Sequence, residues 1–193
     1  LRISDTVHVD TDSVFARTTA LTDQSATVQV RATVRNDFPA PRTVRVETIL
    51  MAPEGRTVAT TSSSEAVIAP GGEIEVDPEL IVARPRLWSP DSPVQYRATV
   101  RVLAAGKTLD EATASFGVRM VRVSAEHGFE LNGRSLKLRG GNVHHDLGPL
   151  GAASFDRAEE RKVALLKAAG FNAVRTAHNP PSTAFLDACD RAG

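Results

Sequence analysis

The chain has 193 residues, with 23 Lys or Arg balanced by 23 Asp or Glu, so its formal net charge at pH 7 is zero. Without a positive surplus, binding to nucleic-acid phosphates or to an acidic membrane surface is not expected. A single cysteine, Cys189, excludes an internal disulfide, and no run approaches the roughly 18 apolar residues of a membrane-spanning helix. The first residues, LRISDTVHVD, lack an initiator Met and the pattern of a secretion signal, so we expect a segment of a longer protein.

Residues 1–118 show the alternation of apolar and polar side chains that is typical of half-buried strands. It is clearest in ATVQVRATVRN, where every second residue from Ala26 to Val34 is apolar. The same period recurs in TVRVETIL, GEIEV and VQYRATVRV, with turn formers such as NDFPAP, APEG, APGG and SPDSP between the runs. Several short strands with no convincing helix between them predict an all-β, immunoglobulin-like β-sandwich.

The pattern changes over residues 119–193. In FELNGRSLKL, the dipeptide Asn132-Gly133 suits the two-residue turn of a β-hairpin. The apolar residues LKL that follow predict a strand that runs into the glycines and histidines of RGGNVHHD.

Two predicted helices alternate with strands in the remaining residues. DRAEERKVALLKAAG is predicted to be helical, with Asp156 as N-cap, Glu159 in a capping position and Gly170 as terminator. FNAVRTAH predicts a strand, and STAFLDACDRAG predicts a helix that is capped by Ser182 and carries Cys189 on its apolar face. This order of elements predicts an incomplete α/β segment with parallel strands.

Polar side chains gather where the two predicted parallel strands end. The first strand ends in Asn142, His144, His145 and Asp146, and the second in Arg175, Thr176, His178 and Asn179. Because ligands of parallel α/β folds bind beyond the carboxyl ends of the strands, these two clusters form the candidate site.

The sequence leaves two explanations open for Arg175 and for the histidines. A buried guanidinium needs an anionic partner from the ligand or from the rest of the protein, whereas an exposed one reaches water or pairs with Asp146. His144 and His145 either contact a ligand or are loop residues that are bonded to the backbone.

A transition-metal site and a serine-based catalytic triad are both disfavoured. The candidate ligands His144, His145, Asp146 and His178 contain no His-x-His or His-x-x-x-His pair, and adjacent residues of an extended chain point in opposite directions. The sequence also lacks the Gly-x-Ser-x-Gly motif of a nucleophile elbow. We therefore expect no metal or other cofactor in this segment.

The stretch NAVRTAHNPPSTAFLDACDRAG resembles the signature of glycoside hydrolase family 2, whose members include β-galactosidases, β-glucuronidases and β-mannosidases. The matching positions are Asn172, Arg175, His178, Pro180, Phe185, Leu186, Asp190 and Gly193. Asn179 departs from the best-known β-galactosidases, which carry Tyr there. LWSPDSPVQYRATVRV, FGVR and FELNGRSLKLRGGNVHHD are also similar to the family, in its order and spacing.

The resemblance implies a retaining exo-β-glycosidase of the β-galactosidase type, whose partner is a β-glycoside. The family has a jelly-roll domain, an immunoglobulin-like sandwich and a TIM barrel with the active site at its top. Residues 1–118 would then be the sandwich. Residues 119–193 would be a linker hairpin and the first two strand–helix units of a truncated TIM-barrel domain.

By position, the resemblance implies that Asn142, His144 and His178 bind the substrate and that Arg175 orients the nucleophilic glutamate. Retaining glycosidases use two carboxyl groups about 5–5.5 Å apart, and the family places both glutamates beyond Gly193. We therefore expect no catalytic residue in this segment and no activity from it alone. The resemblance is compatible with a divalent or monovalent cation bound elsewhere in the full-length enzyme.

The remaining acidic residues and the single tryptophan have simpler explanations. Glu159, Glu160, Asp187 and Asp190 fall on predicted helices, where caps and solvated faces are expected. Trp88 lies between sandwich strands and is expected to pack at a domain boundary rather than to bind a sugar.

A different class of function stays open: a noncatalytic carbohydrate-binding or spacer sandwich with a vestigial C-terminal part. A truncated barrel also leaves apolar strand edges unpaired. We therefore expect the isolated segment to self-associate or to be partly disordered after about residue 140.

Overall fold

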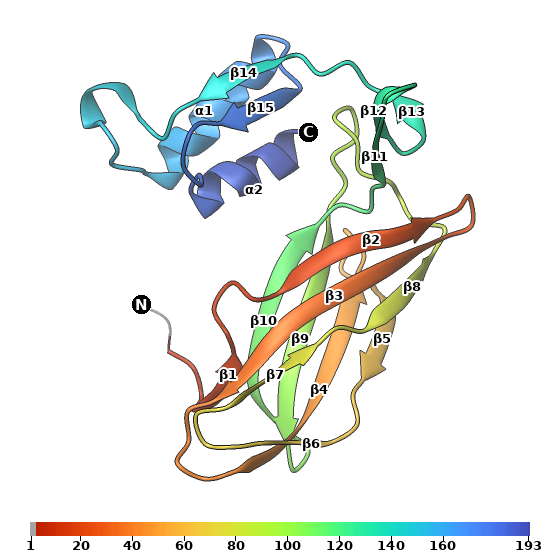
Figure 1. The fold of residues 1–193 in the computed structure, drawn as a ribbon, viewed down its shortest axis with the longest axis vertical. Helices are drawn as coiled ribbons and strands as arrows, with labels where there is room; N and C mark the ends of the chain where they lie inside the picture. The colour runs from red at the N-terminus through yellow and green to blue at the C-terminus, as the bar shows by residue number, and fades with distance from the viewer. Residues whose placement is uncertain (1–2) are drawn as a thin grey trace. The chain divides into compact units, whose positions relative to one another are not determined.

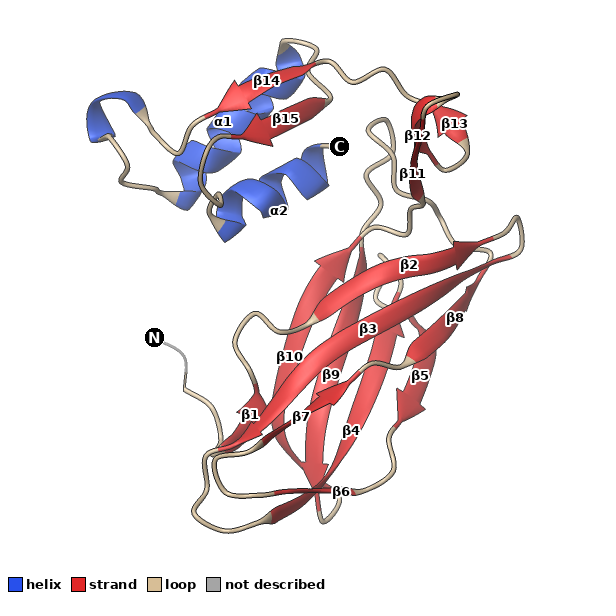
Figure 2. Ribbon diagram, in the orientation of Figure 1, coloured by secondary structure: helices blue, strands red, loops and turns tan. Residues whose placement is uncertain are grey.

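The computed structural model describes residues 3–193, which form two compact units (Figure 1). The first unit runs to Arg86 and resumes over Gln95–Val118, and the second consists of Leu87–Val94 and Arg119–Gly193. The first unit is built from strands, and both α-helices belong to the second (Figure 2). The predicted order, an all-β sandwich followed by an incomplete α/β segment, is confirmed.

Two antiparallel sheets make up the first unit. In one sheet the long strand β3 (Ser25–Asn36) pairs with β1 (Val7–Val9), β2 (Phe15–Leu21), β7 (Glu73–Val76) and β8 (Glu79–Ala83). The other has the order β10-β9-β4-β5, with β6 also paired to β4; its strands are β4 (Arg42–Met51), β5 (Thr57–Ser62), β6 (Ala66–Ile68), β9 (Tyr96–Ala104) and β10 (Lys107–Phe116).

The alternation predicted for β3 matches its burial. Its fully buried apolar side chains are Ala26, Val28, Val30, Ala32 and Val34. The second sheet contributes Val44, Val46, Leu50, Ala98, Val100 and Val102 to the buried core. Burial of apolar area at about 25 cal/mol per Å² is the main term that favours folding of such a core.

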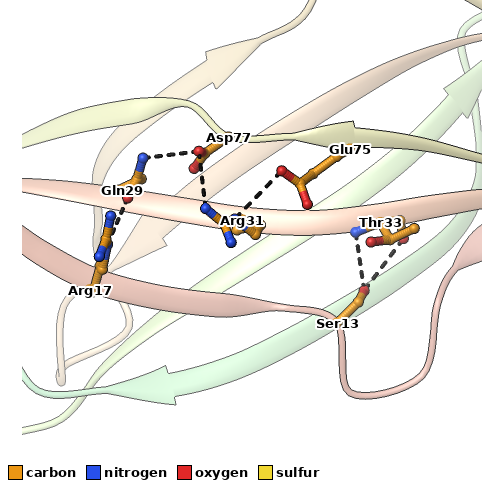
Figure 3. Close-up of polar contacts among 7 residues, drawn as sticks. All are labelled: Ser13, Arg17, Gln29, Arg31, Thr33, Glu75 and Asp77. Atoms are coloured by element: carbon orange, nitrogen blue, oxygen red, sulfur yellow. Dashed lines mark hydrogen bonds and ion pairs between the residues drawn. The ribbon is translucent and has the colours of Figure 1, made fainter.

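Polar and charged side chains lie along the outward side of β3 (Figure 3). Arg31 lies 3.6 Å from Glu75 and 3.7 Å from Asp77, and Gln29 accepts a hydrogen bond from Arg17 and donates one to Asp77. Exposed pairs of this kind contribute about 0–1 kcal/mol each. Along this stretch of β3, the basic side chains are therefore paired with acidic or amide side chains of neighbouring residues.

The second unit contains a small antiparallel sheet of β11 (Val121–Ser124), β12 (Gly128–Leu131) and β13 (Arg134–Ser135). Asn132 and Gly133 between β12 and β13 have φ angles of 53° and 75°, which confirms the predicted two-residue turn. The Asn132 amide donates to the carbonyl of Trp88 at 3.0 Å and accepts from the Met120 N–H at 2.9 Å. The turn is therefore tied to two other segments of the same unit.

The α/β part consists of β14 (Gly140–Val143), a short 3₁₀ helix η1 (Gly148–Leu150), α1 (Asp156–Ala168), β15 (Ala173–Thr176) and α2 (Thr183–Ala192). Strands β14 and β15 pair in parallel, as predicted, and the two helices lie beside them (Figure 1). Among residues 3–193, no helix is both long and apolar enough to cross a membrane.

The strand predicted at LKL begins later than expected, at Gly140. The preceding residues connect the hairpin to the strand pair instead, because the Leu136 N–H donates to the Phe129 carbonyl and the Arg139 N–H donates to the Asn172 side chain. These bonds to separate elements replace a continuous ladder over residues 136–139.

The predicted N-terminus of α1 is wrong by one residue. Phe155 occupies the N-cap position, and Asp156 is the first helical residue, so it makes no capping bond. Glu159 does not complete a capping box, because its carboxylate accepts a hydrogen bond from the Ser154 hydroxyl at 3.2 Å. The predicted terminator is confirmed: Gly170 follows the helix with a φ of 85°, which suits glycine.

Helix α2 begins and packs as predicted. The Ser182 hydroxyl accepts a hydrogen bond from the Phe185 N–H at 3.2 Å. Phe185 and Ala188 form a buried cluster with Val163 of α1, and Cys189 packs against this cluster. Cys189 therefore lies on the apolar face of α2.

Trp88 belongs to the second unit and makes structural contacts there. Its indole N–H donates to the Asp190 carbonyl at 2.9 Å, and the Arg119 guanidinium lies 4.3 Å from the ring centroid. Nearby, the Lys167 ammonium donates to the Pro90 carbonyl at 2.9 Å. Trp88 and Pro90 thus form hydrogen bonds with residues in the last turns of α2 and α1.

Candidate functional site

The register of the parallel pair brings the two predicted clusters together. Asn142 of β14 lies opposite Arg175 of β15, and Val143 lies opposite Thr176. The Arg175 guanidinium donates a hydrogen bond to the Asn142 side-chain oxygen at 3.3 Å. Strands β14 and β15 end side by side (Figure 1), so the side chains at their ends form one polar edge.

The alternation of side chains along the strands separates two faces of this edge. Val143 and Val174 pack against the buried cluster of α1 and α2. Because successive side chains of a strand point to opposite faces, Asn142 and Arg175 point away from the helices. In a barrel whose helices lie outside, this second face is the interior.

Two histidines extend the polar edge beyond the strands. The His144 and His178 rings lie with their centroids 5.6 Å apart and their planes at 80°, in an edge-to-face contact. Both side chains are exposed, and the peptide bond between Ala177 and His178 is cis. Each imidazole offers two nitrogens for hydrogen bonds with hydroxyl groups of a ligand.

The structure thus brings together all four residues that the sequence singled out for binding or orientation: Asn142, His144, Arg175 and His178. The alternative in which Arg175 pairs with Asp146 is wrong, because the guanidinium bonds to Asn142 instead. Arg175 is exposed, and within residues 3–193 no carboxylate forms an ion pair with it. The exposure of Arg175 fits the other alternative, in which the guanidinium reaches water, and it also lets the guanidinium face an acid or a ligand from outside this segment.

A buried charge beneath the polar edge was missed by the sequence reasoning. Glu159 is only 1% exposed, which contradicts the expected solvated position. The Lys162 ammonium lies 3.1 Å from one carboxylate oxygen, and the Ser154 hydroxyl donates to the other. The signal for burial was present, because Glu159 precedes the buried Val163 by four residues, which places both on one face of the helix.

The other helical acids differ in their surroundings. Glu160 forms exposed ion pairs with Arg157 at 3.0 Å and with Arg191 at 3.2 Å, as expected for a solvated face. Asp190 is half-buried, contrary to expectation, and burial raises its pKa although Arg119, 3.9 Å away, opposes the shift. These contacts are structural.

No group of three or more His, Cys, Asp or Glu side chains within residues 3–193 is arranged to hold a metal ion. The second unit also has an apolar hollow of about 210 Å³ next to Trp88, Phe171 and Cys189. It contacts the beginning of β15, where Ala173 and Val174 line it, rather than the polar strand ends. The polar edge is therefore the candidate site.

The chain thus combines a β-sandwich with two parallel strand–helix units whose strand ends carry basic side chains. Residues 7–119 match the family model described as glycosyl hydrolases family 2. Residues 121–193 match the TIM barrel domain model of the same family. The chain belongs to glycosyl hydrolase family 2.

The chain is similar to proteins named as a β-galactosidase and a β-glucuronidase. The chain is 37% identical over 187 residues to Beta-galactosidase BoGH2A from Bacteroides ovatus, which covers 97% of this chain and 22% of the relative. It is 32% identical over 141 residues to a beta-glucuronidase from Bacteroides fragilis, covering 72% of this chain and 20% of that protein. The chain therefore spans about a fifth of the length of these two relatives.

Solved structures show the same arrangement of elements. A glycosyl hydrolase family 2 member from Bacteroides cellulosilyticus superposes with a TM-score of 0.91 at 44% identity, over 98% of this chain and 26% of that protein. The Bacteroides uniformis beta-glucuronidase superposes with a TM-score of 0.89 at 29% identity, over 98% of this chain and 24% of that protein. The strand–helix segment is thus the start of a TIM barrel.

Proposed function

We propose that this chain is part of a retaining exo-β-glycosidase that hydrolyses terminal β-glycosides, most simply β-galactosides. The observation that carries the proposal is the convergence of His144, Arg175 and His178 at one end of the parallel strands. Relatives named beta-galactosidase and beta-glucuronidase support the reaction class. The substrates of a β-galactosidase and of a β-glucuronidase are both carbohydrates. In this proposal, the chain contributes one wall of the substrate pocket.

Each residue of the polar edge has a defined role in this proposal. Asn142, His144 and His178 bind hydroxyl groups of the sugar, since amide and imidazole groups both donate and accept hydrogen bonds. Arg175 orients the nucleophilic glutamate that a later part of the protein supplies. A guanidinium next to a carboxylate favours its ionised form, which is the form that attacks.

The proposed reaction is a double displacement. One glutamate attacks the anomeric carbon while a second glutamate protonates the departing glycosidic oxygen, which gives a covalent glycosyl-enzyme. Water then releases the sugar as the second glutamate accepts its proton. Both glutamates lie beyond residue 193 in this proposal, so the segment alone is inactive. It supplies no metal or other cofactor, and a divalent or monovalent cation of the complete enzyme would bind elsewhere.

Assays of the full-length protein against a panel of nitrophenyl β-glycosides test the proposal. We expect hydrolysis of at least one member of the panel and a decrease in kcat/KM of about 100-fold or more in Arg175→Ala, because an electrostatic contact in the transition state is lost. Arg122→Ala, which removes an exposed arginine of β11, is the matched control and should retain activity. An active enzyme that tolerates Arg175→Ala would contradict the proposed role.

The same panel of nitrophenyl β-glycosides distinguishes a glycosidase from the alternative, a noncatalytic carbohydrate-binding or spacer module. It predicts no hydrolysis by the full-length protein, with sugar binding for a binding module and none for a spacer. Calorimetry with the same glycosides distinguishes these two outcomes.

A further inference from the structure

We propose that Lys162 and Glu159 are positioning residues that hold His144 at the substrate-facing end of β14. The inference rests on the proposed function, in which His144 contacts the sugar, and adds to it two residues that do not reach the substrate. Both residues come from α1, which follows the loop after β14.

The first observation is that Glu159 is buried and that Lys162 next to it is partly buried. The Glu159 side chain is 2% exposed and the Lys162 side chain 19% exposed, with 3.1 Å between carboxylate oxygen and ammonium nitrogen. Removing such charges from water costs several kcal/mol, which is offset only when the geometry satisfies them. Here both carboxylate oxygens have partners, since the Ser154 hydroxyl donates to the one that Lys162 leaves free.

Stability alone does not account for a pair with a buried carboxylate and a partly buried ammonium, because apolar residues of similar volume commonly give equal or greater stability. A better-attested use of such pairs is to select one arrangement of the surrounding chain. The remaining contacts of Lys162 show which arrangement is selected. Its ammonium lies 3.5 Å from the His144 carbonyl oxygen and 5.8 Å from the centroid of the Phe185 ring.

Lys162 therefore connects three elements: α1, the end of β14 and the first turn of α2. An ammonium has three donors, so it can serve the carboxylate and the carbonyl at the same time. The His144 main chain is held from the helix side, while its ring meets His178 on the polar edge. A displacement of about 1 Å in a group that contacts the substrate can cost about 100-fold in rate.

Substitutions in the full-length enzyme test the inference. We expect Lys162→Met to lower kcat/KM by about 10-fold or more, and Lys162→Arg to restore most of the loss because it keeps a cation that can reach both oxygens. Glu159→Gln should act in the same direction as Lys162→Met. Lys167→Met is the matched control: this lysine of the same helix donates to the Pro90 carbonyl, so its loss should lower the melting temperature without a comparable loss of kcat/KM.

A double substitution distinguishes positioning of His144 from a general effect on folding. If Lys162 acts through His144, then Lys162→Met should cause little further loss of kcat/KM in a His144→Ala background. Losses that multiply in the double variant would overturn the inference while leaving the glycosidase function intact.

Crystal structures of the unmodified and Lys162→Met proteins give a readout that does not depend on activity. We expect the His144 ring to leave its contact with His178 in the variant. An unchanged ring pair would overturn the inference. Absence of hydrolysis by the unmodified full-length protein would instead refute the proposed function, and the crystallographic comparison would still decide whether Lys162 positions His144.

Discussion

Cys189 is a half-buried residue whose thiol is kept protonated by its surroundings. It packs against the cluster of Val163, Phe185 and Ala188. Burial raises the pKa of the thiol to about 11, and the negative charges of Asp190 and Glu159 act in the same direction. The thiolate is the reactive form of cysteine, so this residue is structural.

We expect iodoacetamide to modify Cys189 in the folded chain at pH 8 about 100-fold more slowly than in the urea-unfolded chain. Between the ordinary pKa of 9.0 and the folded value of about 11, the unfolded chain releases the proton and the folded chain retains it. Rising pH in this window therefore lowers the free energy of unfolding. Alkylation rates followed by mass spectrometry check the prediction, and equal rates in both states would contradict it.

The polar edge could be predicted from sequence because parallel strands bring their carboxyl ends to the same side. The pairing of Asn142 with Arg175 is one consequence of this rule. The surroundings of Glu159 could not be predicted in the same way. Its residue type indicates solvent, whereas its burial depends on Ser154, on Lys162 and on the packing of α2, which are tertiary contacts.

At the scale of elements, the pairing of β14 with β15 depends on close approach of two backbones. A Cβ atom placed on Gly140 would lie 2.1 Å from the Ala173 carbonyl oxygen, whereas one on Gly141 would lie 3.6 Å from its nearest neighbour, the Phe171 ring. Only the first distance is too short for any real contact. The two adjacent glycines therefore form a matched pair for substitution.

We expect Gly140→Ala to lower the free energy of unfolding of the second unit by about 2 kcal/mol or more, because a backbone carbonyl cannot move aside as a side chain can. Gly141→Ala should change it by less than about 1 kcal/mol. Urea unfolding followed by the fluorescence of Trp88, the only tryptophan, measures both. Equal effects of the two substitutions would show that the strands are not paired in this register.

Most helices and strands could be predicted from the hydrophobic period and from turn-forming residues. Some of their first residues could not be predicted in this way. The predictions of strand β3 and of the Asn132-Gly133 turn were correct because both features depend on local sequence. The predicted first residues of β14 and α1 differ from the observed ones. The first is set by hydrogen bonds of residues 136–139 to distant elements, and the second by the conformation of Phe155.

At the scale of the whole molecule, the chain provides a β-sandwich and the first part of a TIM barrel. Within residues 3–193, β14 and β15 pair only with each other, so each has one edge without a partner. Unpaired strand edges are templates for association with another chain.

We therefore expect the 193-residue chain to self-associate through β14 and β15. Sedimentation velocity should show a sedimentation coefficient that increases with protein concentration across the micromolar range. Hydrogen exchange should be fast in the same strands at low concentration, because their ladder is short and exposed. A concentration-independent monomer with complete amide protection in both strands would contradict this expectation.

The central claim is that the ends of β14 and β15 form one wall of a glycoside pocket. A crystal structure of the full-length protein with a non-hydrolysable β-glycoside tests it most directly. We predict that ring nitrogens of His144 and His178 lie about 3 Å from sugar hydroxyls and that Arg175 lies within about 4 Å of a carboxylate from a later strand. A sugar bound elsewhere, with both imidazoles and the guanidinium in contact only with water, would contradict the claim.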